Sequence, residues 1–244
     1  MTSILITGAG SGIGRATAVA FARAGWDVAL VGRRRDALEE SARIAGCGHV
    51  LPGDVTKAGE VERVFSEAVG AMGRLDVLFN NAGRSSRPKT IDEMPLEDWQ
   101  AVLDINLSGA VMCARAAFAQ MRRQEPQGGR IINNGSISAH APRPGSTPYT
   151  VTKHAITGLT KCLSLDGRPF NIACGQIDIG NALTEMAAQI AKGVPQADGH
   201  IAPEATMDVE DVAKAVLMMA GLPLSANVQF MTVMATKMPF VGRG

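Results

Sequence analysis

Tyr149 and Lys153 are the first residues in the chain whose types and spacing suggest chemistry. Residues four apart are neighbours on one face of a helix, so a helix here places the phenol beside the ammonium group. Thr147 and Pro148 favour a helix start, with Thr147 as the N-cap and Pro148 at the first helical position. A nearby positive charge favours the ionised form of a phenol. The pair therefore suits proton transfer, although ordinary packing on an amphipathic helix explains many pairs with this spacing.

The composition is that of an ordinary globular protein. Of the 244 residues, 46% are apolar and 19% are charged, which excludes wholesale disorder. A chain of this length can bury a sizeable core, and we expect one domain spanning 1–244. The formal net charge of +1 gives no electrostatic case for binding nucleic acid or an anionic membrane.

Cysteine and histidine usage gives no metal signature. The four cysteines, at positions 47, 113, 162 and 174, form no C-x-x-C pair, and the four histidines have no ligand spacing. We therefore expect no metal site, and buried free thiols in a reducing compartment. The N-terminus lacks the features of a signal peptide, and no run of 18 or more apolar residues occurs. These observations predict a cytoplasmic protein without a membrane segment.

Short apolar runs alternate with longer amphipathic stretches, which is typical of repeated strand–helix units and a parallel sheet. We expect strands at 4–7, 28–31, 50–52, 77–80, 130–134, 171–174 and 228–232, and helices at 13–24, 35–45, 60–72, 96–123, 149–165 and 209–220. The stretches 84–94 and 178–207 have no regular pattern. Loops this long inside a compact domain are usually functional.

A glycine-rich turn follows the first strand. Gly8, Gly12 and Gly14 lie between this strand and the next helix. Glycines allow a tight turn and a close backbone approach, so a pyrophosphate can bind the N–H groups at the positive end of the helix. The spacing G-x-x-x-G-x-G is looser than the common dinucleotide fingerprint. Its place between a strand and an amphipathic helix nevertheless favours a dinucleotide site over a plain turn.

Residues after the second and third strands indicate the kind of dinucleotide. Arg33 stands where NAD-preferring folds place an acidic residue for the ribose 2′-hydroxyl, and an arginine suits a 2′-phosphate instead. The pattern favours NADP over NAD, with an exposed arginine-rich helix start as the alternative. Asp54 follows the third strand, where it can accept a hydrogen bond from the adenine amino group or serve as a turn residue.

The segment 80–83, which reads Asn-Asn-Ala-Gly, completes a pattern that resembles the short-chain dehydrogenase/reductase family in its shorter, ketoreductase-like branch. The glycine turn, this segment and the Tyr149/Lys153 pair occur in the family's order and spacing over most of the chain. The resemblance implies a doubly wound α/β Rossmann fold, with a seven-stranded parallel sheet and helices on both faces. It also implies a nicotinamide cofactor and hydride transfer between it and a small-molecule carbonyl or alcohol.

The resemblance assigns functional residues. It implies the catalytic tetrad Asn106, Ser136, Tyr149 and Lys153, with Ser136, 13 residues before the tyrosine, favoured over Ser138. Together with the patterns above, it gives as cofactor-binding residues Gly8, Ser11, Gly12, Ile13, Gly14, Arg33, Asp54, Val55, Asn81, Ala82, Gly83, Tyr149, Lys153, Gly175 and Ile177.

The mechanism that the resemblance implies gives each member of the tetrad a role. In reduction, a hydride passes from NADPH to the carbonyl carbon while Tyr149 protonates the oxygen and Ser136 hydrogen-bonds to it. Lys153 favours the phenolate and binds the nicotinamide ribose. Asn106 is a modest helix former, so we expect an irregular turn that holds a water in a proton relay, with a simple helix bend as the alternative.

One segment departs from the family pattern. Relatives usually have Pro-Gly followed four residues later by threonine; here Cys174 replaces the proline and Ile179 replaces the threonine. The backbone of Ile177 can still meet the carboxamide, and whether Asn181 replaces the missing hydroxyl stays open. We expect the stretch 180–207, rich in alanine, methionine and glutamine, to form a substrate lid, with a surface helix hairpin as the alternative.

The C-terminal run 230–240 begins as a strand and ends apolar. By resemblance it packs at the interface of a homo-oligomer, a tetramer or a dimer, and packing within its own subunit is the alternative. The competing function is a non-catalytic NADP(H)-binding sensor on the same fold, against which the complete tetrad argues. An epimerase or enoyl reductase is a third possibility, which the chain length and motifs fit less well.

Overall fold

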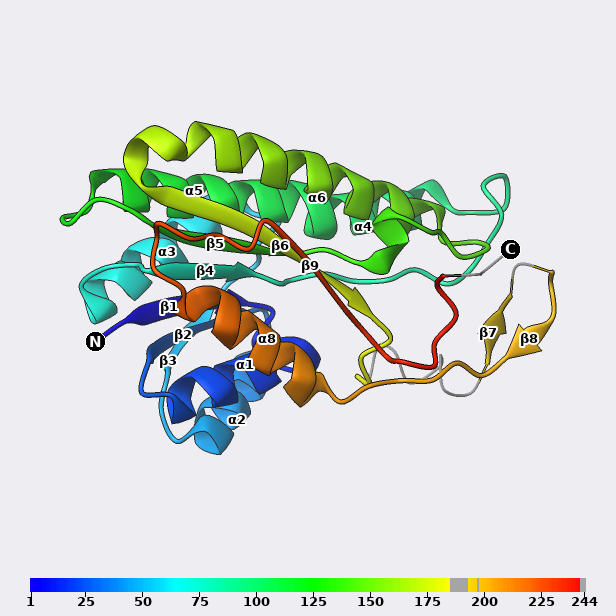
Figure 1. Cartoon of the computed structure of the whole chain (residues 1–244), viewed down its shortest axis with the longest axis horizontal. Coiled ribbons are helices and arrows are strands. Elements are labelled where there is room, and N and C mark those ends of the chain that lie inside the picture. The colour runs from blue at the N-terminus through cyan, green and yellow to red at the C-terminus, as the bar shows by residue number, and fades with distance from the viewer. Residues whose placement is uncertain (185–192, 197, 242–244) are drawn as a thin grey trace.

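The computed structural model describes residues 1–184, 193–196 and 198–241. Seven parallel strands form one sheet in the order β3-β2-β1-β4-β5-β6-β9, so the chain winds outward from the centre in both directions (Figure 1). This confirms the expected doubly wound fold. The two short strands β7 and β8 form a separate antiparallel hairpin.

The strands are β1 (Ser3–Thr7), β2 (Asp27–Gly32), β3 (His49–Pro52), β4 (Val77–Asn80), β5 (Gly129–Asn134), β6 (Ile172–Gly180), β7 (Val194–Pro195), β8 (Ile201–Ala202) and β9 (Phe230–Met234). The helices are α1 (Gly12–Arg23), α2 (Arg35–Ala45), α3 (Ala58–Met72), α4 (Leu96–Leu103), η1 (Asp104–Gly109), α5 (Ala110–Arg123), η2 (Ile137–Ala139), α6 (Thr147–Asp166), η3 (Arg168–Phe170) and α8 (Val209–Gly221).

The central strands are buried on both faces, because each face is covered by helices. Successive strand residues point to opposite faces, so Ile4 and Ile6 of β1 join a core with α1 and α8, whereas Leu5 joins a core with α3 and α5. In Figure 1, α1, α2 and α8 lie below the sheet and α5 and α6 above it. The loops that leave the strands' carboxyl ends therefore meet at one edge of the sheet.

Two predicted strands were placed too early in the chain. The sixth was expected at 171–174, but β6 begins at Ile172 and continues to Gly180. Asn171 has a φ of +56°, a left-handed conformation outside strand geometry, and the polar residues read as a loop are buried inside the strand. The last strand was expected at 228–232 and runs instead over Phe230–Met234.

The helix expected over 96–123 is interrupted by the π-helical turn η1. This turn contains Asn106, so the irregular turn expected there is confirmed. The stretch Leu96–Arg123 is also long and apolar enough, by length and composition alone, to span a membrane. Its Cys113, Ala117 and Met121 pack in the core with α3, so we interpret it as a core helix of the fold.

The four cysteines divide into two classes. Cys113 and Cys174 are buried, and burial raises the pKa of both thiols to about 12. Cys47 and Cys162 are exposed, so the expectation of buried thiols was wrong for these two. All four are free, and the part of the chain that the structure describes contains no group of three histidine, cysteine or acidic residues able to hold a metal ion.

Candidate active site

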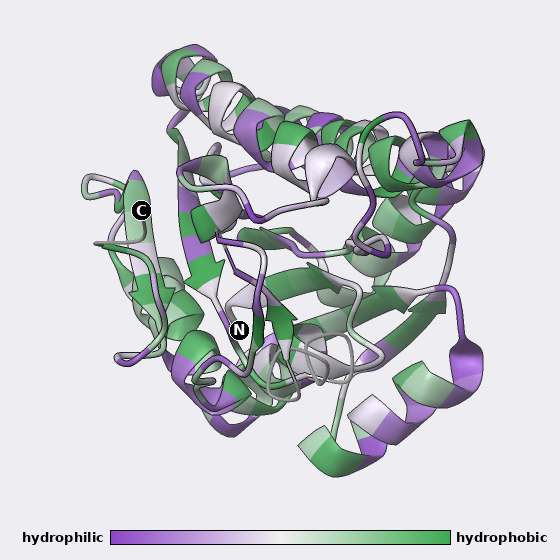
Figure 2. Cartoon of the chain, turned by 90° about the vertical axis from the view of Figure 1, so that its right-hand side faces the viewer, coloured by the Kyte–Doolittle hydropathy of each residue, from purple (hydrophilic) through white to green (hydrophobic). Residues whose placement is uncertain are grey.

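The predicted site residues gather where the carboxyl ends of β1, β4, β5 and β6 meet, the side of the molecule that Figure 2 turns toward the viewer. Thr7 ends β1, and its side chain accepts hydrogen bonds from the backbone N–H groups of Asn81 and Ala82, both at 2.9 Å. These contacts join the glycine-rich turn to the 80–83 segment. The hydroxyl is fully buried, so both N–H groups depend on it.

The glycine-rich turn is folded back tightly on itself. Gly8 and Gly12 have positive φ angles of +68° and +50°, which glycine adopts without steric cost. Gly14 lies so close to the turn that an added Cβ would stand 2.2 Å from the carbonyl oxygen of Gly8. The side chain of Thr184, from the start of the predicted lid, lies against Gly12. The turn and the lid base are therefore in contact.

A line of hydrogen bonds connects this turn to the Tyr149/Lys153 helix. The Asn81 amide donates to the Thr7 carbonyl at 2.8 Å, and the Asn134 amide donates to Asn81 Oδ1 at 2.8 Å. The Lys153 ammonium donates to the carbonyl of Asn134 at 2.6 Å. We call this chain of hydrogen bonds, from Thr7 through Asn81 and Asn134 to Lys153, the asparagine line. It fixes the glycine-rich turn and the helix that carries Tyr149 relative to each other.

A cavity of about 180 Å³ lies beside the glycine-rich turn. It is lined by Gly8, Gly10, Ser11, Gly32, Arg33, Arg34, Ala37, Leu38, Gly53, Asp54, Val55, Ala82, Gly83, Arg84 and Ile105. Seven of the predicted cofactor residues are in this lining: Gly8, Ser11, Arg33, Asp54, Val55, Ala82 and Gly83. The positive end of α1 and the arginines give the cavity a character that suits phosphate groups.

Arg33 and Asp54 face this cavity from neighbouring strand ends. Burial alone would raise the pKa of the Asp54 carboxyl, but hydrogen bonds from the N–H and hydroxyl of Thr56, with the charges of Arg33 and Lys57, hold it below its ordinary value. Asp54 is therefore an ionised hydrogen-bond acceptor at neutral pH.

Other predicted cofactor residues do not line the cavity: Gly12, Ile13, Gly14, Asn81, Tyr149, Lys153, Gly175 and Ile177. Gly175 and Ile177 lie inside β6, in register with β5, and are buried. An added Cβ on Gly175 would stand 2.1 Å from the carbonyl oxygen of Val228, so a glycine is required there by packing alone. The structure does not bring these two residues to the cavity.

Asn106 holds the loop that follows the 80–83 segment. Its side-chain oxygen accepts from the N–H of Arg84 at 2.8 Å, and its amide donates to the Arg84 carbonyl at 2.9 Å. The amide also approaches the hydroxyl of Thr152, on α6, at 3.4 Å. Asn106 thus lies, 3% exposed, between the cofactor loop and the helix that carries Lys153.

Ser136 and Tyr149 are carried by the two ends of one loop. Ser136 is buried directly after β5, and its side-chain oxygen accepts from the N–H of Ser138 at 3.1 Å, which starts the short helix η2. Tyr149 lies in the first turn of α6 as expected, but the helix begins at Thr147 with Ser146 as its N-cap, one residue earlier than predicted. The Lys153 ammonium is 5.5 Å from the centre of the Tyr149 ring. The helical pairing of these two side chains is confirmed.

Asn181 has taken a structural role. It follows β6 with a left-handed φ of +50°, and its side chain accepts from Arg143 at 2.6 Å and donates to Glu204 at 2.8 Å. Arg143 and Glu204 also form an ion pair, in which the side chain of Glu204 is buried and that of Arg143 is partly exposed. These contacts commit the amide of Asn181 to the lid base, and we assign it no part in replacing the hydroxyl that Ile179 lacks.

Much of the predicted lid at 180–207 lies outside the described residues, which omit 185–192 and 197. Its two ends are hydrogen-bonded to each other, because Leu183 donates to the Met207 carbonyl at 2.8 Å and Met207 to the Asn181 carbonyl at 2.9 Å. The C-terminal run packs partly within its own subunit, where Ala235 and Met238 join a small core with Ile137.

This arrangement is that of a doubly wound α/β protein whose glycine-rich turn is connected by hydrogen bonds to the helix with Tyr149 and Lys153. The model of the short chain dehydrogenase family matches residues 2–195. The chain belongs to this family, whose members are oxidoreductases acting on CH–OH and C=O groups.

Individual relatives span most of the chain. A 3beta-hydroxysteroid dehydrogenase from Mediterraneibacter gnavus is 34% identical over 208 residues, 76% of this chain and 73% of the relative. Sulfoacetaldehyde reductase 2 from Chromohalobacter salexigens is 33% identical over 240 residues, 96% of this chain and 94% of the relative. Among solved structures, the closed form of serine dehydrogenase complexed with NADP⁺ matches with a TM-score of 0.86 at 25% identity, over 100% of this chain and 96% of that one.

Several residues of the site were missed in the sequence. Arg34 and Arg84 line the cavity, and Thr7 locks the turn. Arg34 stands next to Arg33, so the arginine run carried a signal for it. The role of Thr7 depends on partners 74 and 75 positions away, which no local pattern indicates.

Replacing Thr7 with Val should destabilise the fold by roughly 2 kcal/mol, because two buried N–H groups lose their acceptor. Urea unfolding measures the change. Thr17→Val is the matched control: Thr17 is equally buried, but its hydroxyl only donates to the Ile13 carbonyl within α1, so we expect a change within about 0.5 kcal/mol. Equal losses in the two variants would contradict this role for Thr7.

Proposed function

We propose that the protein is an NADP(H)-dependent oxidoreductase that transfers a hydride between nicotinamide and a small-molecule carbonyl or secondary alcohol. The observation that carries the proposal is the asparagine line, because it joins the glycine-rich turn to the helix with the Tyr149/Lys153 pair. Cofactor site and proton donor are thereby held as one unit.

The cavity fits the adenosine half of a dinucleotide. Its walls include Gly8 and Ser11, at the positive end of α1, which suit a pyrophosphate. Arg33 supplies the planar, permanently charged group that suits a ribose 2′-phosphate, and Asp54 supplies an acceptor for the adenine amino group. The NADP⁺ in the related serine dehydrogenase structure supports a nicotinamide cofactor, and the choice of NADP over NAD rests on Arg33.

The proposed chemistry divides between the cofactor and the chain. The bound nicotinamide supplies or accepts the hydride. In reduction, the Tyr149 hydroxyl gives its proton to the carbonyl oxygen as negative charge develops there, and in oxidation it takes the proton back. Ser136 hydrogen-bonds to the same oxygen in this proposal. Its Oγ accepts from the N–H of Ser138, and its hydroxyl, which donates to the Ile179 carbonyl at 3.5 Å, turns from that carbonyl to the substrate oxygen.

Lys153 and Asn106 serve the proton path in this proposal. The Lys153 ammonium stabilises the phenolate that remains when Tyr149 gives up its proton. Asn106, in the π-helical turn, holds the Arg84 backbone with both ends of its amide and so keeps the loop beside α6 in place. Turns of this kind are frequent at functional sites.

We further propose that residues 1–244 act as one cofactor-binding domain in the cytoplasm, with 180–207 as the cover of the substrate. The hydrogen bonds between the two ends of this segment hold both ends beside the candidate active site, which supports this role. Exposed free thiols at Cys47 and Cys162 suit a reducing compartment.

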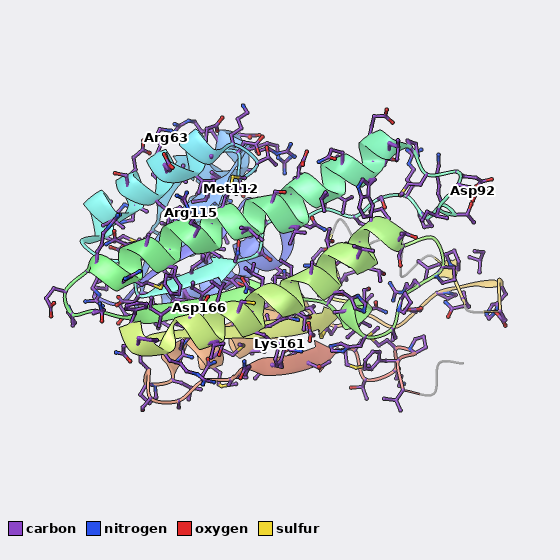
Figure 3. The ribbon with its side chains drawn as sticks, turned by 90° about the horizontal axis from the view of Figure 1, so that it is seen from above. Arg63, Asp92, Met112, Arg115, Lys161 and Asp166 are labelled. Atoms are coloured by element: carbon purple, nitrogen blue, oxygen red, sulfur yellow. The ribbon has the colours of Figure 1, made fainter. Side chains whose placement is uncertain are left out.

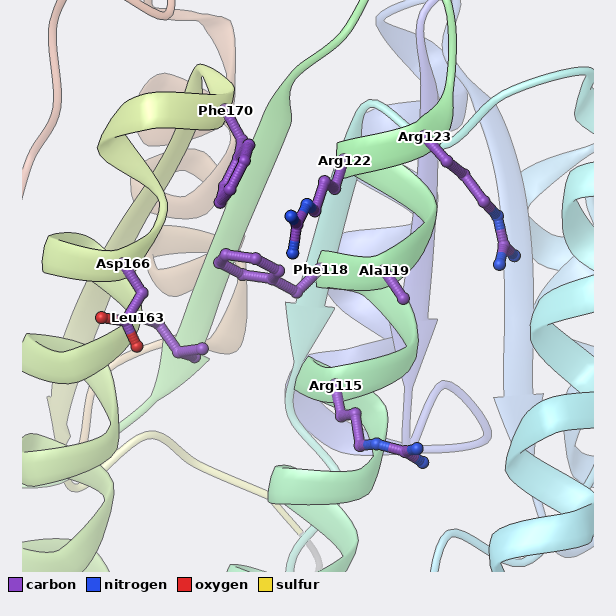
Figure 4. A pocket seen from close by; sticks show the side chains of 8 residues that line it. All are labelled: Arg115, Phe118, Ala119, Arg122, Arg123, Leu163, Asp166 and Phe170. Carbon is purple, nitrogen blue, oxygen red and sulfur yellow. The ribbon is translucent and has the colours of Figure 1, made fainter.

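The outer face of α5 and α6 supports a homo-oligomer, a dimer or a tetramer. A hollow of about 700 Å³ lies between the two helices, away from the candidate active site, and is lined by Arg115, Phe118, Ala119, Arg122, Arg123, Leu163, Asp166 and Phe170 (Figure 4). Arg115 on α5 and Asp166 on α6 lie on the same face (Figure 3), so two copies related by a twofold axis can pair opposite charges around an apolar centre.

Replacing Tyr149 with Phe should lower turnover by about 100- to 10,000-fold, because the ring remains but the proton donor is lost. Initial rates of NADPH oxidation, measured over a panel of ketones, aldehydes and keto-acyl thioesters, test this. NADPH binding, followed by fluorescence, should stay within about twofold of the parent. Undiminished turnover in the variant would rule out the mechanism, and no binding of either nicotinamide cofactor to the parent would rule out the function.

Replacing Arg33 with Asp should shift the ratio of NADPH to NADH affinity by about 10- to 100-fold toward NADH, since a hydrogen bond to a charged group contributes about 1.5–3 kcal/mol. Titrations with both cofactors measure the ratio. Arg35→Asp is the control, because Arg35 is exposed, pairs with Glu39 at 3.7 Å and does not line the cavity. An unchanged ratio in Arg33→Asp would show that another residue reads the phosphate.

Replacing Ala119 with Arg should reduce the mass of the particle in solution toward the 25.5 kDa of one chain, because like charges would meet at the twofold contact. Sedimentation velocity measures the mass. Ala71→Arg, on the exposed end of α3, should leave the oligomer intact. A parent protein that sediments as a monomer would contradict the proposed interface.

A further inference from the structure

A buried carboxylate lies directly against the serine loop. Asp178, in β6, is 1% exposed. Its Oδ1 accepts hydrogen bonds from the backbone N–H of Ser136 at 3.0 Å and from the Gln176 amide at 2.7 Å. Its Oδ2 lies 3.0 Å from Nε2 of His140. A buried carboxylate is costly unless it is hydrogen-bonded, and both oxygens of Asp178 have partners.

The backbone of the serine loop is shaped to reach this carboxylate. Gly135 immediately precedes Ser136, and an added Cβ there would stand 2.0 Å from Asp178 Oδ1 and 2.6 Å from the Gln176 amide nitrogen. Only a residue without a side chain allows this approach. The loop is therefore built around the carboxylate.

The same carboxylate is connected to the helix that carries Tyr149. The Gln176 amide donates to the Thr157 hydroxyl at 3.1 Å, and the Thr160 hydroxyl donates to the Gln176 oxygen at 3.0 Å. Both threonines belong to α6. Asp178 thus ties the serine to the tyrosine helix through a network of buried polar groups, and such networks hold their members in one arrangement.

His140 connects this buried network to solvent. Its side chain is 47% exposed, whereas that of Asp178 is 2% exposed. The other charged groups around the loop have different partners: Lys153 donates to the Asn134 carbonyl, and Arg143 pairs with Glu204. Among the described residues, His140 is the only ionisable side chain with a hydrogen-bond or ion-pair contact to Asp178.

We propose that Asp178 and His140 are positioning residues for Ser136: the carboxylate holds the serine N–H, and the charge on His140 sets how strongly it does so. This rests on the proposed function for Ser136. Neither residue needs to touch the substrate. The pair acts through the backbone of Ser136, so its effect falls on turnover rather than on cofactor binding.

A readout without substrate tests the pair directly. In the ¹⁵N-labelled protein, the backbone amide of Ser136 should shift with pH along the titration curve of the His140 ring, because the hydrogen bond between this amide and Asp178 changes with the imidazole charge. In His140→Gln the amide shift should become independent of pH in that range. A Ser136 amide that ignores the His140 titration in the parent would overturn the proposal, whether or not the protein turns over any substrate.

Steady-state kinetics of variants at Asp178 and His140 are the second test of the proposal. Asp178→Asn keeps the shape of the side chain and removes its charge, and it should lower kcat by up to about 100-fold with the NADPH dissociation constant unchanged. His140→Ala should lower kcat, and His140→Gln, which keeps an N–H donor, should recover most of it but lose the parent's pH dependence. Unchanged kcat and pH profile in both Asp178→Asn and His140→Ala would overturn the proposal.

His49→Gln is the matched control. His49 pairs with Asp27 at 2.7 Å and is similarly exposed, but this pair lies at the starts of β2 and β3, the opposite edge of the sheet. We expect its kcat, its pH profile and the Ser136 amide titration to equal those of the parent. A change as large as that in His140→Gln would assign the effect to general electrostatics and overturn the proposal.

Discussion

The asparagine line is the interaction on which the rest of the site depends. Its hydrogen bonds run across the ends of three neighbouring strands, from Thr7 on β1 past β4 to Asn134 on β5, and on to Lys153 of α6. Because strands in a sheet are fixed relative to one another, side chains at their ends can be placed with little conformational freedom. The positions of the groups proposed to transfer the proton are thus set by the sheet, although the groups lie on a loop and a helix.

Much of the fold was predictable because its signals are local. The continuous apolar run of β1, buried on both faces, and the amphipathic spacing along the helices depend only on residues close in sequence. The end of β6 was not predictable in this way. Gln176 lies beyond the strand expected at 171–174, and Asp178 begins the stretch with no regular pattern, yet both are buried in β6 with partners from other parts of the chain. Polar residues inside a sheet are recognised only when their partners are known.

The candidate site likewise contains residues that local motifs predict and residues that they do not. The tetrad and the glycine turn follow family spacing, and seven predicted cofactor residues line one cavity. Gly175 and Ile177 were transferred from a family segment whose neighbouring residues are changed here, and both lie within a strand. Residues that act by holding others, such as Thr7 and Asp178, carry no motif, because their effect depends on a backbone N–H group far away in sequence.

The Arg143–Glu204 ion pair has a consequence for how the protein could be recombined with its relatives. One partner lies on the loop between Ser136 and Tyr149, the other at the far end of the 180–207 segment, and Asn181 bridges them. A graft that removed Arg143 alone would leave the buried Glu204 carboxylate without this counter-ion, which is destabilising. A graft that removed Glu204 alone would take this carboxylate from the partly buried Arg143. The two loops therefore depend on each other, and a chimaeric protein should take both loops from the same parent protein.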